Sequence, residues 1–242
     1  MAGATFSYIG GMFLNDAFDA EFDKQYRAER PIPAGRISQP SVWRWGLAWV
    51  CLGELCFINC GILTGTLGII LIVTILCYDA FHKQIAWAPL LMGLCRFWLY
   101  LIAASTGASG VTGWAIWCGL ALAIYVIGLS FVARGEAIPT PLRYWPVLLM
   151  AAPIFLAFLM NADGYREPAL LLSAVLGLWT LRAIRHTFWS TPPRIGTTVS
   201  QLLAGIVFVD WLAMADASRQ ISVVFIGLFL GALLLQRVIP AT

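Results

Sequence analysis

The hydrophobic pattern of this chain consists of long apolar runs separated by short polar segments. Each run is close to the length of about 20 residues that an α-helix needs to cross the hydrocarbon of a bilayer. The runs cover residues 2–20, 42–62, 64–82, 88–107, 113–133, 144–161, 168–188, 197–215 and 220–238. The break between the second and third runs, from Gly61 to Thr66, is the least marked. The pattern predicts an all-α, polytopic transmembrane bundle of about eight or nine spans.

The composition agrees with a membrane protein. Hydrophobic residues make up 60% of the chain and charged residues 11%, whereas a soluble domain carries about a quarter charged residues. No low-complexity tract or soluble appendage is visible, so we expect a single transmembrane domain over residues 1–242. The six cysteines lie in apolar stretches without a CxxC motif, which favours apolar packing over a zinc or disulfide framework. No P-loop, GxGxxG or GxSxG motif supports nucleotide binding or serine hydrolysis.

The basic residues orient the predicted bundle, because cytoplasmic loops are enriched in Lys and Arg. If the loop after the first run is cytoplasmic, only Arg166 and Arg219 of the 15 basic residues fall in outer loops, and Arg96 falls inside a run. The net charge of +3 then reflects topology and not nucleic-acid binding. We therefore expect a multi-pass membrane protein with its basic loops on the cytoplasmic side.

An acidic cluster of Asn15, Asp16, Asp19 and Asp23 ends the first apolar run. On a helix, Asn15, Asp19 and Asp23 fall within about 80° of one another, with Asp16 beside them. A charged group near the bilayer interior costs several kcal/mol and needs a partner, and Mg²⁺ prefers such oxygen ligands. The interleaved apolar residues favour a helix face turned toward a polar cavity. The alternative is a solvated face that pairs with nearby basic residues, namely Lys24, Arg27 and Arg30.

A basic, proline-containing segment follows the acidic cluster. Pro31 and Pro33 predict an extended backbone that stops the helix, and Gly35 permits a tight turn. Arg30 suits phosphate oxygens, because its donors form a planar fork. Arginines kept only for topology would explain the charge but not the rigid frame. The segment and the acidic cluster together therefore predict a magnesium–diphosphate site.

A second polar cluster ends the third run and contains Tyr78, Asp79, His82 and Lys83. Asp79 and Lys83 are four residues apart and can form a surface ion pair worth a few tenths of a kcal/mol. The alternative is that Lys83 reaches the same phosphate while Asp79 or Tyr78 orients a ligand. Arg96 lies about two turns into the following run, where a cation needs an anion. We expect Arg96 to pair with Asp79 or to face the substrate.

These motifs resemble the UbiA superfamily of intramembrane prenyltransferases. The resemblance rests on NDxxDxxxD at residues 15–23, on RPIPxGxIS at residues 30–38 and, more weakly, on YxxxxK at residues 78–83. It implies that the chain ionises an isoprenyl diphosphate with Mg²⁺ and passes the prenyl cation to a hydrophobic or aromatic acceptor in the membrane. Metal and basic side chains would neutralise the leaving diphosphate, and aromatic faces would stabilise the cation.

The resemblance also implies roles for individual residues. The implied catalytic residues are Asp16, Asp19 and Asp23. The implied substrate-binding residues are Asn15, Arg30, Tyr78, Asp79, Lys83 and Arg96. The implied metal ligands are Asn15, Asp16, Asp19, Asp23 and Glu136. Phe18, Phe22 and Trp98 are candidates for an aromatic lining by their proximity in sequence.

Two departures from the family pattern leave an alternative function open. We expect the chain to lack one helix that members carry before the first motif. The loop that corresponds to a second Asp-rich motif, residues 133–137, holds the single carboxylate of Glu136, which we interpret as a remnant of the second metal site. A UbiA-like branch from bacterial secondary-metabolite gene clusters is similar in this respect. The alternative is a degenerate protein that binds a prenyl lipid or diphosphate as a carrier or scaffold in metabolite biosynthesis or export.

Overall fold

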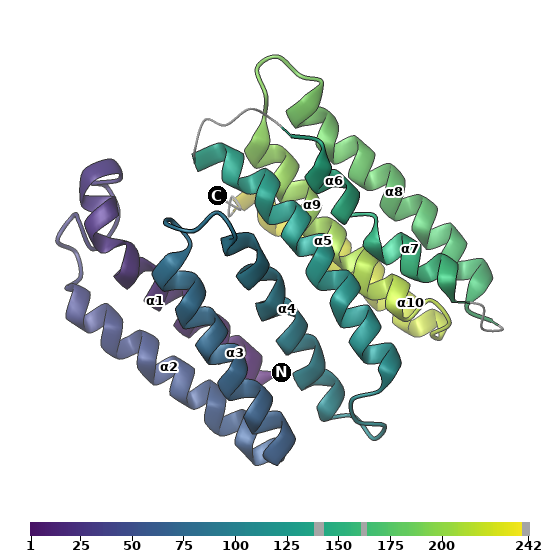
Figure 1. Cartoon of the computed structure of the whole chain (residues 1–242), viewed down its shortest axis with the longest axis horizontal. Helices are drawn as coiled ribbons and strands as arrows, with labels where there is room; N and C mark the ends of the chain where they lie inside the picture. Colours follow the sequence, from purple (N-terminus) through teal and green to yellow (C-terminus); the bar gives the residue numbers. More distant parts are fainter. Residues whose placement is uncertain (138–142, 161–163, 239–242) are drawn as a thin grey trace. The chain divides into compact units, whose positions relative to one another are not determined.

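The computed structural model describes residues 1–137, 143–160 and 164–238 (Figure 1). Within these ranges the chain forms α-helices and no β-strand, which confirms the predicted all-α class. Seven of the described helices are long and apolar enough to cross a membrane. They are α2 (Gln39–Cys60), α3 (Ile62–Phe81), α4 (Ala88–Ser105), α5 (Gly113–Ala137), α8 (Arg166–Phe188), α9 (Ile195–Ala213) and α10 (Arg219–Val238).

The first helix, α1 (Ala2–Tyr26), differs from these seven in its polarity. It starts where the first apolar run starts but continues beyond residue 20, so that the whole acidic cluster is helical. Asp19 and Asp23 are buried on the same helix as Leu14 and Ala17. The acidic cluster is therefore carried by a packed helix, as the interleaved apolar residues indicated.

The predicted span at residues 144–161 is not one continuous helix. Two short helices occupy this stretch, α6 (Trp145–Leu149) and α7 (Ala152–Leu159). Pro153 explains the interruption, because it has no amide hydrogen and its ring would clash with the carbonyl of Leu149 four residues earlier. Proline is tolerated in the first turn of a helix, which is where Pro153 lies in α7.

The chain divides into two compact units, Met1–Ile116 and Trp117–Thr242. In the first unit α1 packs against α2 and α3, and α3 packs against α4 (Figure 1). In the second unit α9 packs against α8 and α10, and α7 packs against α8. The polar clusters that end α1 and α3 both belong to the first unit, so that packing within this unit positions them.

Close contact between α1 and α2 depends on glycine. A Cβ atom added at Gly10 would lie 2.6 Å from Cγ2 of Val50 and 2.9 Å from the carbonyl oxygen of Gly46. Small residues at helix contacts let the backbones approach, and in a membrane this van der Waals packing is a main source of helix association. The contact holds α1, and with it the acidic cluster, against the rest of the unit.

We expect the substitution Gly10→Ala to lower the unfolding temperature of the purified protein in detergent. The added methyl group must push α1 away from α2, and overpacking of this kind costs about 1–3 kcal/mol. Gly11→Ala is the matched control, because its Cβ would meet only Cγ2 of Ile75, at 3.3 Å. Equal unfolding temperatures for Gly10→Ala and the wild type would contradict the close α1–α2 contact.

Candidate functional site

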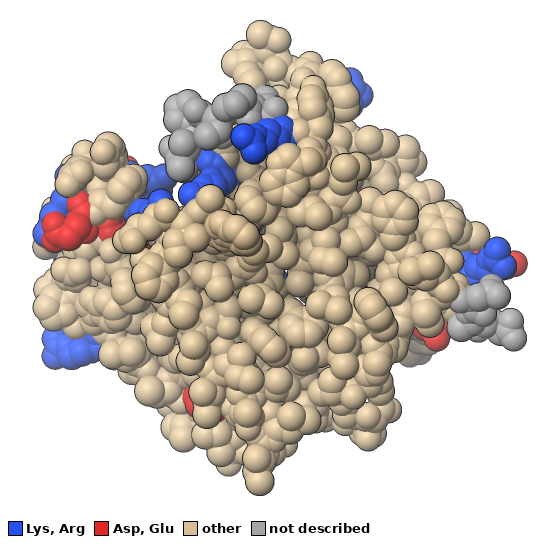
Figure 2. Space-filling view, in the orientation of Figure 1, with Lys and Arg blue, Asp and Glu red and all other residues tan. Residues whose placement is uncertain are grey.

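The end of α1, the segment that follows it and the end of α3 meet in one polar cluster. Figure 2 shows acidic and basic surface atoms gathered together over the end of α1 and the following segment, beside a largely uncharged surface. Hydrogen bonds and ion pairs connect the residues of this cluster. We call it the acidic site, and it comprises Asn15, Asp16, Asp19, Asp23, Arg30, Asp79, His82 and Lys83.

Asp19 is paired with Lys83, across the contact between α1 and α3. The Lys83 Nζ atom lies 2.7 Å from Oδ1 of Asp19 and 3.7 Å from the centroid of the Phe22 ring. Asp19 is buried, so that its charge requires a close partner. The predicted surface pair between Asp79 and Lys83 is therefore replaced by a pair that joins two helices.

Arg30 bridges two carboxylates of α1. Its Nη1 atom lies 3.0 Å from Oδ1 of Asp16 and 3.3 Å from Oδ2 of Asp23. The Asp23 side chain is 3% exposed and that of Asp16 is 51% exposed, so that the buried Asp23 depends more on this guanidinium. Pairing with a nearby arginine, one of the two alternatives for the acidic residues, is thus present in the structure.

Asp79 and Asn15 form the third link between α3 and α1. The Asn15 amide donates a hydrogen bond of 3.2 Å to Oδ1 of Asp79. Oδ2 of Asp79 is buried, and none of the described residues forms a hydrogen bond with it. A buried carboxylate oxygen without a partner is costly, so that a ligand able to bind it would stabilise the site.

His82 is a member of the acidic site that the sequence did not single out as a site residue. Its Nε2 atom lies 3.6 Å from Oδ1 of Asp19, and its ring stacks on Tyr78 with a centroid distance of 5.1 Å. The spacing of four residues between Tyr78 and His82 puts the two rings on the same face of α3. This spacing is the feature of the sequence that could have identified His82 as a site residue.

The segment after α1 is turned and not extended, so that this part of the prediction is wrong. The carbonyl oxygen of Arg30 accepts from the amide of Ala34 at 2.9 Å, and that of Pro31 accepts from Arg36 at 3.0 Å. Proline fixes φ near −65°, which suits turns as well as extended chain. Gly35 has a φ of +71°, the left-handed conformation that the predicted tight turn requires.

Three further predicted residues of the first unit, Arg96, Phe18 and Trp98, are not part of the acidic site. Arg96 is in α4, and no ion pair among the described side chains joins it to Asp79. Phe18 packs edge-on against Trp43 of α2, and Trp98 packs against the core formed by α2, α3 and α4. Glu136 is in the last turn of α5, but its side chain lies outside the described part of the chain, so that its metal-binding role stays a prediction.

The donors of the acidic site are of the type that a hard divalent cation prefers, namely carboxylate and amide oxygens. The buried, unpartnered Oδ2 of Asp79 adds an acceptor, so that the residues present fit such an ion. Among the described side chains, no three His, Cys, Asp or Glu residues converge as a metal-binding group. The carboxylates of α1 are instead directed to Lys83 and Arg30.

Comparisons with known proteins agree with the motifs. A model of the UbiA prenyltransferase family matches residues 1–192. A digeranylgeranylglyceryl phosphate synthase of Ignicoccus hospitalis is 42% identical over 64 residues, which is 26% of this chain and 21% of that protein. A protein of the same name from Sulfolobus acidocaldarius is 34% identical over 70 residues, or 29% and 25% of the two chains. The matched segments thus span a quarter or less of these curated relatives, and no solved structure matches.

We expect the substitution Arg30→Gln to destabilise the protein, because it leaves the buried charge of Asp23 unpaired. The loss should be about 1–3 kcal/mol, below that for a fully buried pair, since the Arg30 side chain is 32% exposed. Thermal unfolding in detergent measures the effect. Asp23→Asn added to Arg30→Gln should restore part of the stability. A double variant that is no more stable than Arg30→Gln alone would contradict the pairing.

Proposed function

The chain belongs to the UbiA prenyltransferase family, and on this premise we propose that it transfers an isoprenyl group from an isoprenyl diphosphate to a hydrophobic acceptor within the membrane. The observation that carries the proposal is the acidic site. It combines oxygen donors for a hard cation with two basic side chains suited to phosphate, Arg30 and Lys83. Both sets of groups are needed to stabilise a leaving diphosphate.

We propose that Mg²⁺ is held by the oxygen donors of α1, which are Asn15, Asp16, Asp19 and Asp23. When bound, Mg²⁺ would neutralise charge on the diphosphate and so favour its departure. Asp79 would act as a positioning residue, because its Oδ1 atom accepts the Asn15 amide hydrogen and would leave the Asn15 carbonyl oxygen available to the ion. Tyr78 stacks on His82 and would hold the neighbouring imidazole in place.

Arg30 and Lys83 would change partners when substrate binds. In the structure they neutralise Asp16, Asp23 and Asp19. If those carboxylates turn to a divalent cation, the guanidinium and the ammonium become available to the oxygens of the diphosphate. The exchange keeps the buried charges compensated throughout, as a site of low dielectric requires.

The residues around the diphosphate would then support ionisation of the allylic substrate. The bond between C1 and the diphosphate oxygen breaks, and its electron pair leaves with the diphosphate. A nucleophile of the acceptor attacks the allylic cation and afterwards loses its proton to the released diphosphate. Phe22, which contacts Lys83, is an aromatic ring at the site, and apolar surroundings would exclude water from the cation.

We propose a lipid as the acceptor, with the acidic site on the cytoplasmic side of a bacterial inner membrane. The two relatives are named for digeranylgeranylglyceryl phosphate, which favours a geranylgeranyl donor and a glyceryl phosphate lipid over an aromatic ring.

The second candidate function is that of a carrier or scaffold that binds the prenyl diphosphate without turnover, for example in secondary metabolism. The single carboxylate of residues 133–137 favours this alternative.

Turnover by the purified full chain tests the proposal. With geranylgeranyl diphosphate, geranylgeranylglyceryl phosphate and Mg²⁺, we expect release of diphosphate and formation of the doubly prenylated lipid, detected by mass spectrometry. Asp19→Asn should slow the reaction by about 100-fold, the effect of losing one electrostatic contributor.

Glu21→Gln is the matched control for this prediction. Glu21 lies on the same helix, its side chain is 76% exposed, and it is outside the acidic site, so that the variant should react at a rate close to that of the wild type. Equal rates for Asp19→Asn and Glu21→Gln would contradict the site. Binding of the donor without release of diphosphate by the wild type would favour the carrier.

A further inference from the structure

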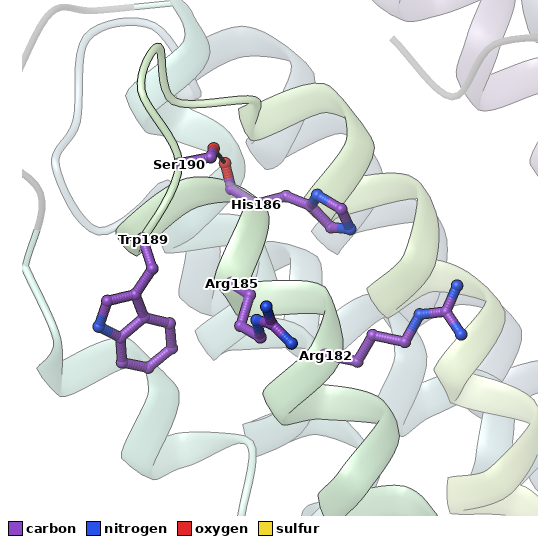
Figure 3. A pocket seen from close by; sticks show the side chains of 5 residues that line it. All are labelled: Arg182, Arg185, His186, Trp189 and Ser190. Carbon is purple, nitrogen blue, oxygen red and sulfur yellow. Dashed lines mark hydrogen bonds between the residues drawn. The ribbon is translucent and has the colours of Figure 1, made fainter.

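A second candidate site lies in the other compact unit, at the C-terminal end of α8. A cavity of about 480 Å³ is lined by Arg182, Arg185, His186, Trp189 and Ser190 (Figure 3). Its volume is in the range that accommodates small ligands, but its lining is basic. The first four residues follow the spacing i, i+3, i+4 and i+7, which places them on one face of a helix. None of the residues assigned to prenyl transfer lines this cavity.

The two arginines of the cavity have no acidic partner in the described part of the chain. Among the described side chains, no ion pair with a carboxylate includes Arg182 or Arg185. Arg182 has its Cζ atom 5.7 Å from the centroid of the Trp179 ring, a contact with the ring face that leaves the N–H groups of the guanidinium available. Figure 3 shows both arginine side chains leaving the last turns of α8 at the cavity.

Basic side chains near the end of a helix often donate hydrogen bonds to its last carbonyl groups. Here the carbonyl oxygens of Arg185 and His186 accept from other donors. The amide of Trp189 donates to the carbonyl oxygen of Arg185 at 3.0 Å, and the amide of Arg194 donates to that of His186 at 2.7 Å. The Ser190 hydroxyl also donates to the His186 carbonyl oxygen. Helix capping therefore does not account for the arginines.

His186 is oriented by a residue of the next helix. Its Nε2 atom lies 3.4 Å from Nε2 of Gln201, whose Oε1 atom is buried and forms no hydrogen bond with the described residues. Donation from the Gln201 amide to Nε2 places the imidazole proton on Nδ1. The ring therefore keeps one N–H donor among the residues that line the cavity.

We propose that this cavity binds a phosphate group, supplied by an anionic lipid headgroup or by a soluble phosphate. Two guanidinium forks are the preferred protein partners of phosphate oxygens, and the imidazole of His186 and the indole N–H of Trp189 are further donors. α8 is one of the candidate membrane spans, so that its basic end is expected at the depth of the lipid headgroups, where basic pockets recognise them. The cavity shares no residue with the isoprenyl diphosphate site proposed above.

Ligand binding to the wild-type full chain with EDTA present tests this proposal. Without a divalent cation, the carboxylates of the acidic site keep Arg30 and Lys83 paired, so that the acidic site should not compete for an anionic probe. The probes are dihexanoyl phosphatidic acid, below its micelle-forming concentration, and inorganic phosphate, both titrated by calorimetry in detergent. Arg185→Gln should weaken binding by about tenfold, the effect of losing a charge-assisted contact. Arg182→Gln, which removes the other guanidinium, should act in the same direction.

Arg194→Gln is the matched control, because it removes the same charge from the segment after α8 but does not line the cavity. This variant should bind the probes with an affinity within about twofold of that of the protein without the substitution, as expected for the loss of a charge in a medium of high dielectric. Binding of phosphatidic acid alone supports the lipid headgroup, and binding of both probes supports the phosphate group itself. Absence of binding by either probe, or equal losses in Arg185→Gln and Arg194→Gln, would overturn the proposal. Neither result bears on turnover at the acidic site.

Discussion

The buried carboxylates of Asp19 and Asp23 need positive charges, and much of the first unit is organised around that requirement. Lys83 comes from the end of α3 and Arg30 from the turned segment after α1, so that both must lie against α1 for the charges to be paired. The close packing of α1 on α2 at Gly10 supports the same arrangement from the apolar side. Charge compensation and backbone packing therefore act together to hold the acidic face of α1 against the rest of the unit.

The same compensation links the structure to its proposed chemistry. A site that already pairs carboxylates with arginine and lysine contains the two kinds of group that a metal–diphosphate complex needs. Ligand binding then exchanges the partners of charges that are already buried, so that none of these charges is left uncompensated. The unpartnered Oδ2 of Asp79 is the one feature of the described acidic site that this pairing leaves unsatisfied, and it lies beside Asn15, a predicted metal ligand.

The sequence predicted the helical class, most of the helix positions and the location of the acidic site, because apolar runs and motif spacing are local signals. It did not predict the break at Pro153, since a proline can occur inside an apolar run and the run alone does not show whether the helix continues. It also did not predict that Lys83 pairs with Asp19 and not with Asp79, because this depends on how α1 and α3 pack. The sequence also did not predict the basic cavity at α8. Its arginines indicate membrane topology, and a cavity depends on packing and not on a local sequence pattern.

Mg²⁺-dependent binding of geranylgeranyl diphosphate to the wild-type chain tests whether the acidic site holds a metal–diphosphate complex. We predict that affinity falls by at least about tenfold when Mg²⁺ is removed by EDTA, because the carboxylates then keep Arg30 and Lys83 and repel the diphosphate. Ca²⁺ or Mn²⁺, which also prefer oxygen ligands, should restore part of the affinity. Equal affinity with and without a divalent cation would show that the diphosphate does not bind at the acidic site.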